Sequence, residues 1–244
     1  NGDEYEGGFL ADMKQGDGRT MYATGDEIFV YEGSFERDMR HGLGKCSGTD
    51  GSEYEGSFVG DVKSGRGYLV EANGSTYEGD FLDDLKHGHG KCTLADGSVY
   101  EGGYVRGLRH GNGRYCFPQC EVYTGEWKAD LRCGKGNTRY ASGDEFNGMF
   151  ENGVRHGEGE YISKDGSCFK GIYKFDKKCG FGIALNSSGD SYEGEYNNDQ
   201  RHGSGKFTWC TGDVYQGQWD CDLASGSGVH IWANGDKYDG EWSG

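Results

Sequence analysis

Aromatic residues and glycines alternate along this chain in a motif that recurs with a fixed period. We number the opening aromatic of each copy position 0; position 2 is then glycine and position 4 is aromatic in all eleven copies. Apolar side chains at every second position are typical of a β-strand that buries one face. The copies open at Tyr5, Tyr31, Tyr54, Tyr77, Tyr100, Tyr123, Phe146, Phe169, Tyr192, Tyr215 and Tyr238, in steps of 23 residues except the first, which is 26.

A second strand follows in every complete copy. Positions 11 and 13 are glycine in all ten copies that reach them, and we expect positions 11 to 16 to pair with positions 0 to 4 across a six-residue loop. Asp-Gly or Asn-Gly turns, as at Asp50-Gly51 and Asn73-Gly74, then return the chain to the next copy. Each copy is therefore predicted to be a β-hairpin, and so strict a period indicates an array in which neighbours bury one another's faces.

The predicted fold class is all-β. We expect an elongated single-sheet solenoid, or meander, of about ten full hairpin repeats and a terminal half repeat. Residues 1–244 are expected to form one array, with an insertion near 26–30 and an irregular turn at 117–120, where Cys120 replaces the turn glycine. Because the chain begins without Met, we expect it to be a fragment of a longer one.

Opposite charges predict how the two strands of a copy pair. If position 1 faces position 14, a glutamate at one should accompany a base at the other. Glu55, which faces Tyr68 in this register, is the one glutamate that lacks such a base. The same register places the aromatic of position 4 opposite the glycine of position 11, so that the ring covers bare backbone. The charged pairs are Glu6 with Arg19, Glu32 with Lys45, Glu78 with Lys91, Glu101 with Arg114, and Glu193 with Lys206.

Composition narrows the possible functions. Hydrophobic residues make up only 33% of the chain, whereas glycine occupies 48 positions and aromatic residues 14%, so burial must come mainly from Tyr, Phe and Trp. A formal net charge of -16 argues against nucleic-acid binding and disfavours an anionic membrane. No apolar run approaches the roughly 20 residues of a membrane-spanning helix, and no signal peptide is visible. Nine cysteines, an odd number, indicate free thiols in a reducing compartment, which predicts a cytoplasmic protein.

Histidine and cysteine recur at position 10 without the spacing of a metal site. Adjacent copies lie two strands, roughly 10 Å, apart, whereas zinc ligands must all lie about 2.0 to 2.3 Å from one ion. We therefore expect these side chains to cap loops, and we expect no metal, cofactor or catalytic residue; zinc or a disulfide shared across a dimer stays open. The glycines at positions 11 and 13 lack the string and the helix of a P-loop. The residues concerned are His41, His87, His110, His156, His202, Cys133 and Cys179.

The repeat unit resembles a known family. Its pattern YEG-x-[FYW]-x5-[HC]-G-x-G, as in YEGGYVRGLRHGNG from Tyr100 to Gly113, is similar to the MORN repeat over essentially the whole chain. The resemblance implies a twisted sheet of hairpins with a groove that binds proteins and assembles cytoskeletal or membrane-proximal complexes. It also implies an association with phosphoinositides.

The aromatic face is the expected partner-binding surface. A non-enzymatic scaffold would hold a protein segment, such as a helix, in a groove along this face. A regulatory arm on an enzyme, with the catalytic domain outside this chain, is a further alternative. The candidate residues are Tyr54, Phe58, Tyr77, Phe81, Tyr100, Tyr104, Tyr123, Trp127, Tyr192, Tyr196, Tyr215 and Trp219.

Basic residues at position 9 form a second candidate surface. A cation recurring about every 10 Å could follow an anionic lipid surface, which makes a lipid-binding module the rival function. Position 7 is Asp in eight copies, however, and we expect the two charges to neutralise each other on one loop. The lipid candidates are Lys86, Arg109, Arg132, Arg155, Lys178 and Arg201.

The outer face changes character in one region, from charged to apolar. In the expected register Ile172 lies directly opposite Phe181, and Ile183 replaces the usual base. A contiguous exposed apolar patch usually marks an interface, so we expect an antiparallel two-fold homodimer. The alternative is a decayed repeat that its own loop covers, with Phe175 as the lid. The patch consists of Met149, Ile162, Ile172, Phe181, Ile183 and Leu185.

Overall fold

The computed structural model describes residues 4–24 and 27–244 and contains 21 β-strands and no helix among them. The prediction of an all-β meander of tandem hairpins is confirmed. The expected insertion near 26–30 begins at Asp26, which lies outside the described residues. Its remainder belongs to strand β3, and the preceding strand β2 is the longest, with 12 residues.

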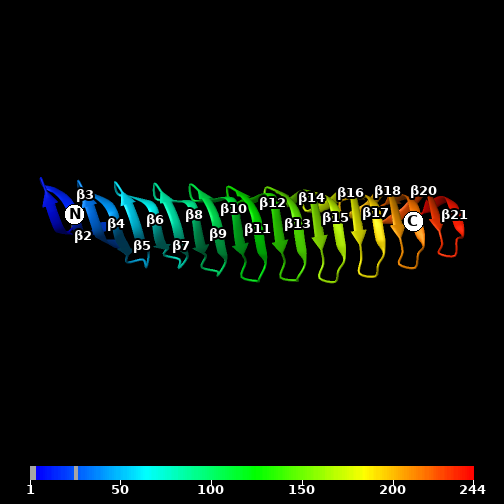
Figure 1. Ribbon diagram of the computed structural model, residues 1–244, viewed down its shortest axis with the longest axis horizontal. Coiled ribbons are helices and arrows are strands. Elements are labelled where there is room, and N and C mark those ends of the chain that lie inside the picture. The colour runs from blue at the N-terminus through cyan, green and yellow to red at the C-terminus, as the bar shows by residue number, and fades with distance from the viewer. Residues whose placement is uncertain (1–3, 25–26) are drawn as a thin grey trace. The chain divides into compact units, whose positions relative to one another are not determined.

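The first compact unit comprises residues 1–118 and 127–130. Within it each strand pairs antiparallel with the next along the chain, as Figure 1 shows from blue to green. Its strands are β1 (Glu4–Leu10), β2 (Met13–Thr24), β3 (Glu27–Glu36), β4 (Met39–Gly48), β5 (Glu53–Val59), β6 (Val62–Val70), β7 (Thr76–Leu82), β8 (Leu85–Thr93), β9 (Val99–Val105) and β10 (Leu108–Cys116).

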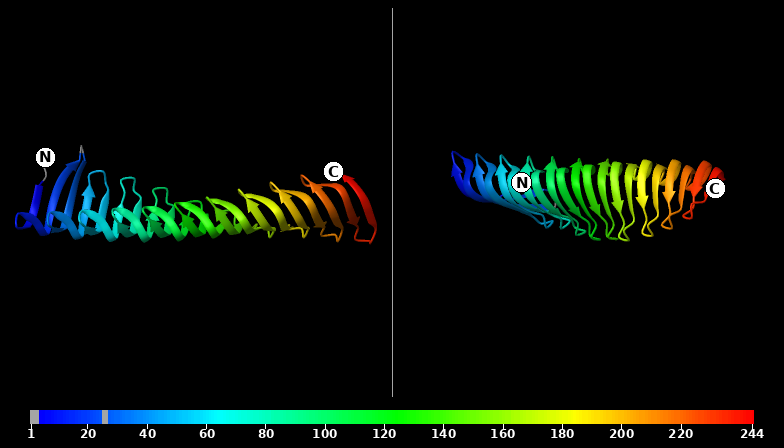
Figure 2. Two further views of the ribbon diagram at one scale, coloured as in Figure 1. Left: turned by 90° about the horizontal axis from the view of Figure 1, so that it is seen from above. Right: turned by 45° about the vertical axis from the view of Figure 1, so that its right-hand side comes forward.

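The second unit comprises residues 119–126 and 131–244. Strand β11 (Val122–Lys128) has residues in both units. The remaining strands follow the same antiparallel order: β12 (Leu131–Arg139), β13 (Glu145–Glu151), β14 (Val154–Ile162), β15 (Cys168–Lys174), β16 (Lys177–Leu185), β17 (Ser191–Asn197), β18 (Gln200–Thr208), β19 (Val214–Asp220), β20 (Leu223–Ile231) and β21 (Lys237–Ser243). Within each unit, hairpin turns lie along one edge of the sheet and the connections between hairpins along the other (Figure 2).

The hairpin turn is shorter than expected. Only positions 6 and 7 are turn residues, and both have positive φ, as at Asp83 (φ 50°) and Asp84 (φ 66°). The prediction of a six-residue loop was therefore wrong, because a two-residue turn with this handedness matches the twist of the flanking strands. The predicted Asp-Gly and Asn-Gly connections are confirmed: Gly74 has φ 86°, its N–H donates to the Glu71 carbonyl at 2.8 Å, and Asn73 Oδ1 accepts from Ser75 N at 2.8 Å.

The predicted register holds in one half of each hairpin and fails in the other. Glu78 lies opposite Lys91, which confirms the pairing of position 1 with position 14. Beyond the glycines a bulge intervenes, and Phe81 lies opposite Lys86 rather than Gly88. Gly88, with φ 61°, instead faces Tyr104 of the next copy. The expected pairing of positions 4 and 11 was thus wrong within a hairpin, but it describes the contact between successive copies.

The neighbouring copy also provides the missing partner of Glu55. This residue faces Tyr68 in its own hairpin, as predicted, and it faces Lys45 of the preceding copy on its other side. Each strand inside the array has two neighbours, so Arg19, Lys45 and Lys91 each lie between two glutamates. The charge pattern therefore stabilises the contacts between copies as well as those within them.

The core is a row of aromatic rings packed over paired glycines. A Cβ added to Gly79 would lie 2.5 Å from the Tyr77 hydroxyl and 2.6 Å from Cα of Gly90. The prediction that a ring covers bare backbone is correct, but the ring belongs to position 0, not to position 4. The Tyr77 hydroxyl donates to the carbonyl of Asp80 at 2.9 Å, and the ring meets Phe81 edge-on, with centroids 5.1 Å apart.

We predict that Gly79→Ala destabilises the fold sharply. Gly79 has no positive φ to favour glycine, so the effect is steric: the added methyl would overlap Tyr77 and Gly90. Overpacking of this kind costs about 1 to 3 kcal/mol. Thermal unfolding followed by circular dichroism should show a clear fall in the midpoint, whereas Ser64→Ala on strand β6 should change it little. Equal midpoints for the two variants would show that the ring and glycines are not packed as described.

Candidate functional site

The twelve aromatic residues expected to bind a partner form the core of the array. Their exposed fractions range from 0% for Tyr77 to 7% for Tyr196. Burial raises the pKa of Tyr54 and Tyr100 to about 12, so these hydroxyls stay protonated hydrogen-bond donors at neutral pH. A partner on this face would therefore contact mainly the residues that lie over the rings.

Those covering residues are the cations of position 9. The guanidinium carbon of Arg109 lies 4.4 Å from the ring centroid of Trp127, and that of Arg201 lies 4.2 Å from Trp219. Cations placed over aromatic faces in this way are attracted by the ring quadrupole. The basic ladder thus lies on the aromatic face, with side chains partly buried: the exposed fraction is 20% for Lys86, 25% for Arg109, 28% for Arg132, 22% for Arg155 and 25% for Arg201.

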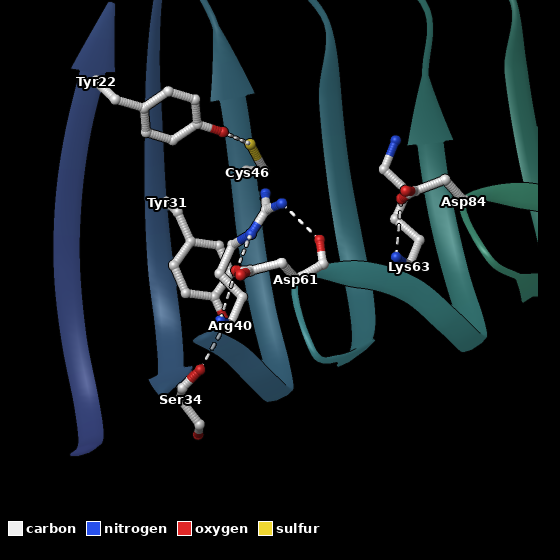
Figure 3. Close-up of polar contacts among 8 residues, drawn as sticks. All are labelled: Tyr22, Tyr31, Ser34, Arg40, Cys46, Asp61, Lys63 and Asp84. Atoms are coloured by element: carbon white, nitrogen blue, oxygen red, sulfur yellow. Dashed lines mark hydrogen bonds and ion pairs between the residues drawn. The ribbon is translucent and has the colours of Figure 1, made fainter. Parts of the chain in front are cut away.

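Four of the five arginines of the ladder are each held by an aspartate from the next copy, as Figure 3 shows for Arg40. Asp61 Oδ1 accepts from the backbone N–H of Arg40 at 2.8 Å and from its Nε at 3.3 Å. The Asp61 N–H donates back to the Arg40 carbonyl at 3.0 Å. The charges neutralise each other as expected, but between copies rather than on one loop. The same clasp joins Arg109 to Asp130, Arg155 to Asp176 and Arg201 to Asp222.

The ladder departs from this clasp in two ways. Where position 7 of the next copy is glycine, another carboxylate takes over: Lys86 pairs with Glu71 at 2.8 Å and Arg132 with Glu121 at 3.7 Å. Where position 9 is lysine and the aspartate is present, the carboxylate accepts only the backbone N–H, as Asp84 does from Lys63 at 2.9 Å. Burial lowers the pKa of the Lys63 ammonium.

An open groove of about 750 Å³ runs along the aromatic face of the second unit. One wall is formed by Arg155, Lys178 and Arg201, and the floor by rings of the core. The opposite wall is formed by Ser163, Ser167, Leu185, Asn186 and Asp190, from positions 16 to 21. The first unit has a smaller cavity of about 240 Å³, lined by Lys86, Cys92, Leu94, Tyr100, Tyr104, Gly107, Arg109, Tyr115 and Asp130.

The second wall of the groove was not identified from the sequence. The alternation of the strand continues to positions 15 and 17, whose side chains point toward the aromatic face. Extending this alternation along the sequence could have identified the residues of this wall. The wall is well ordered by its own polar contacts. The side chain of Asn186 and the backbone N–H of Cys210 lower the pKa of Asp190 to about 2, so its carboxylate is ionised throughout the physiological range.

The position 10 side chains are dispersed. His41 Nε2 lies 3.5 Å from Glu36, His156 Nε2 lies 3.5 Å from Glu151, and His202 Nδ1 lies 3.3 Å from Asp220. Over residues 4–24 and 27–244, no group of three His, Cys, Asp or Glu side chains could hold a metal ion. The described residues include all nine cysteines and contain no disulfide.

The apolar patch of the outer face is exposed but arranged differently from the prediction. Ile172 faces Cys179 in its hairpin, and Phe181 faces Glu195 of the next copy, because the bulge at Gly180 shifts the pairing. The two were therefore wrongly expected to lie opposite each other. The exposed fractions are 55% for Phe181, 47% for Ile183, 42% for Leu185 and 44% for Ile162, while Met149 and Ile172 are half-buried.

The proposed lid residue lies at a hairpin turn. Phe175 occupies position 6, is 68% exposed, and places its ring edge-on to His156 with centroids 5.2 Å apart. Leu185, in turn, lines the groove of the aromatic face.

The tandem hairpins, the ring-over-glycine core and the repeated clasp define a β-hairpin repeat protein. The family model described as MORN repeat matches ten times in tandem, at residues 5–27, 31–53, 54–76, 77–99, 100–119, 123–145, 146–168, 169–191, 192–214 and 215–237. The chain therefore belongs to the MORN repeat family.

Solved structures resemble the chain only distantly. The TCP domain of Drosophila melanogaster SAS-4, solved with a proline-rich motif of Ana2, is 12% identical, covers 72% of this chain and 89% of its own, and gives a TM-score of 0.36. The TCP10 domain of Danio rerio CPAP is 12% identical, covers 79% of this chain and 96% of its own, and gives 0.39. At these TM-scores the likeness carries no argument about function. No curated protein matches the chain, and the described part of it has no helix long and apolar enough to cross a membrane.

We predict that Gly107→Asp stabilises the first unit. Gly107 occupies position 7 with φ 84°, and its N–H already donates to the Lys86 carbonyl at 2.8 Å. An aspartate there would accept from the Lys86 N–H, as Asp84 does from Lys63, and contribute about 1 kcal/mol. Thermal unfolding should show a higher midpoint. The control Gly107→Ala has no carboxylate and a strained φ, so it should lower the midpoint; equal effects of Asp and Ala would contradict a stabilising clasp.

Proposed function

We propose that this chain is a protein-interaction scaffold whose groove in the second unit holds a segment of a partner protein. The observation that carries the proposal is the groove itself, about 750 Å³ in volume, with a position 9 cation from each of three successive copies along one wall. Its cations recur two strands apart, roughly every 10 Å. A helix of about 13 residues spans the roughly 20 Å between Arg155 and Arg201 at 1.5 Å per residue.

The geometry of the ladder favours a protein over a lipid surface. Arginines that are clasped by aspartates and packed on rings offer little free charge to a membrane, and the formal net charge of -16 repels one. We infer that the protein acts in the cytoplasm in a cytoskeletal or membrane-proximal complex, on the strength of its family. A regulatory arm on an enzyme would use the same groove to hold a segment of that enzyme.

We also propose that the apolar patch of the outer face joins two copies as an antiparallel homodimer. Phe181 and Ile183 are about half exposed at positions 12 and 14, which carry polar side chains in most other copies. Charges of both signs surround them: Ile183 faces Lys170 on one side and Glu193 on the other. A two-fold axis can place the positive groups of one copy against the negative groups of the other. A partner that carried charges of one sign only would be repelled by some of these groups.

Site-specific photo-crosslinking in cells tests the groove. A benzoylphenylalanine that replaces Lys164, which is exposed beside Ser163 of the groove wall, should yield a discrete crosslinked protein, whereas one that replaces Tyr68 in the first unit, which is 46% exposed, should not. The crosslinked product should disappear when Ser163 is additionally replaced by tryptophan to fill the groove. Crosslinking from position 164 to lipid alone, or equal protein crosslinking from both positions, would contradict the scaffold proposal.

Sedimentation equilibrium tests the dimer. The wild-type chain should associate at tens of micromolar, and the double variant Phe181→Asp with Ile183→Lys should be a monomer, because new charges would be buried without partners. The control Leu10→Lys changes an equally exposed apolar residue of the first unit (65% exposed) and should leave association unchanged. If wild type and the double variant behave alike, whether as monomers or as dimers, the patch is not the dimer contact.

A further inference from the structure

One cation of the groove in the second unit has no counter-ion. Arg155 and Arg201 each hold an aspartate Oδ1 at 3.0 Å from Nε. Lys178, between them, has no carboxylate within ion-pair distance of its ammonium among the residues that the structure describes. Asp199 Oδ1 accepts instead from the backbone N–H of Lys178, at 2.8 Å. Figure 3 shows the same contrast in the first unit, where hydrogen bonds run from the guanidinium of Arg40 but only from the backbone nitrogen of Lys63.

The residue opposite Lys178 does not compensate its charge. Tyr173 pairs with Lys178 across strands β15 and β16, lines the groove, and is 2% exposed. Its ring lies under Arg155, whose guanidinium carbon is 5.0 Å from the ring centroid, and its hydroxyl is buried. Other tyrosines at position 4 face arginine, and other lysines at position 9 face phenylalanine. The copy that opens at Phe169 is thus the only one that places a tyrosine opposite a lysine here.

The surroundings of Lys178 leave its charge partly uncompensated. The ammonium lies 4.5 Å from the ring centroid of Phe169 and 5.8 Å from that of Tyr196. Burial lowers its pKa, with the charge of Asp199 acting in the opposite direction. An anion placed beside a partly desolvated ammonium gains more than it would in water. A buried donor that lacks an acceptor is also costly, so a ligand that supplies one is favoured.

We propose that Lys178 anchors a carboxylate of the segment that lies in the groove. This inference rests on the proposed function and names the chemistry of its partner. An ammonium without a counter-ion suits an oxygen of an Asp, Glu or C-terminal carboxylate. Since the flanking arginines are already neutralised by aspartates, Lys178 is the point in the groove where charge complementarity selects an acidic group.

A random 12-residue peptide library displayed on phage, selected on the purified chain, supplies the probe. Peptides that bind in the groove are those that no longer bind the Ser163→Trp variant, in which tryptophan fills the groove. We expect these peptides to share an acidic residue. Replacing that residue by its amide should weaken binding of the synthetic peptide about tenfold, the scale of a charge-assisted hydrogen bond. Lys178→Met should weaken the acidic peptide equally but leave the amide peptide unchanged. Tyr173→Phe removes only a buried hydroxyl and should leave both affinities unchanged.

Two further variants control for folding and for the ladder in general. Lys63→Met removes the corresponding cation of the first unit, outside the groove, and should leave affinity unchanged. Lys178→Arg keeps the charge and the packing but lets the guanidinium reach Asp199, as the neighbouring arginines reach their aspartates, so affinity should fall as it does in Lys178→Met. Thermal unfolding establishes whether each variant is folded. If Lys178→Met is not folded, the affinity of Lys178→Arg tests the anchor instead.

The outcomes separate the anchor from the groove. If the selected peptides bind Ser163→Trp as well as wild type, the groove is not the binding site and the proposed function fails. If the peptides need the groove but share no acidic residue, the proposed anchor is wrong and the scaffold proposal is unaffected. The same holds if the effects on affinity of Lys178→Met and of replacing the acidic residue are coupled by less than twofold. Binding of phosphoinositide-containing vesicles that is lost in Lys178→Met would also overturn it, by assigning the cation to a phosphate.

Discussion

The close approach of two glycines beneath an aromatic ring is the contact on which every repeat depends. Positions 2 and 13 face each other, as Gly79 faces Gly90, and the ring of Tyr77 lies where two Cβ atoms would be. Each glycine costs roughly 0.5 to 1 kcal/mol of conformational entropy, and burying the ring returns roughly 1.5 to 3 kcal/mol. The balance is narrow for one hairpin, so the array gains its stability where each ring also meets the ring of the next copy, as Tyr77 meets Tyr104 at 5.2 Å.

The bulge after the glycine pair sets where the cations lie on this core. It lets position 9 lie opposite position 4, and in nine of the copies the cation lies over an aromatic ring, either position 0 of its own copy or position 4 of the next. In the second unit three of these cations form one wall of the groove. The tyrosine hydroxyl stabilises the bulge by donating to its carbonyl, as Tyr192 does to Glu195 at 3.0 Å. Phe146 and Phe169 cannot make this bond, although both remain buried. The fold therefore tolerates loss of the hydroxyl but requires the ring.

Periodicity revealed the hairpins and half of their register, and the reasons for the remaining errors are local. The pairing of Glu78 with Lys91 is unaffected by residues inserted beyond the glycines, so the charge pattern could not reveal the bulge. The tight turn was missed because residues such as Arg37 and Asp38 adopt positive φ without the Asn-Gly or Gly-Gly signature. The alternation placed the aromatic residues on one face, but the burial of their rings, and hence the position of Lys178 and Asn186 on the groove walls, depends on how successive copies cover one another.

The ladder at position 9 shows how an array with a nearly invariant backbone can still carry a local site. Arginine and lysine donate the same backbone hydrogen bond to the aspartate of the next copy, at 2.9 Å from Arg155 and 2.8 Å from Lys178. The planar fork of arginine reaches that aspartate a second time, whereas the ammonium of lysine does not. Exchange of one for the other therefore leaves the fold intact and changes whether a cation is available to a ligand.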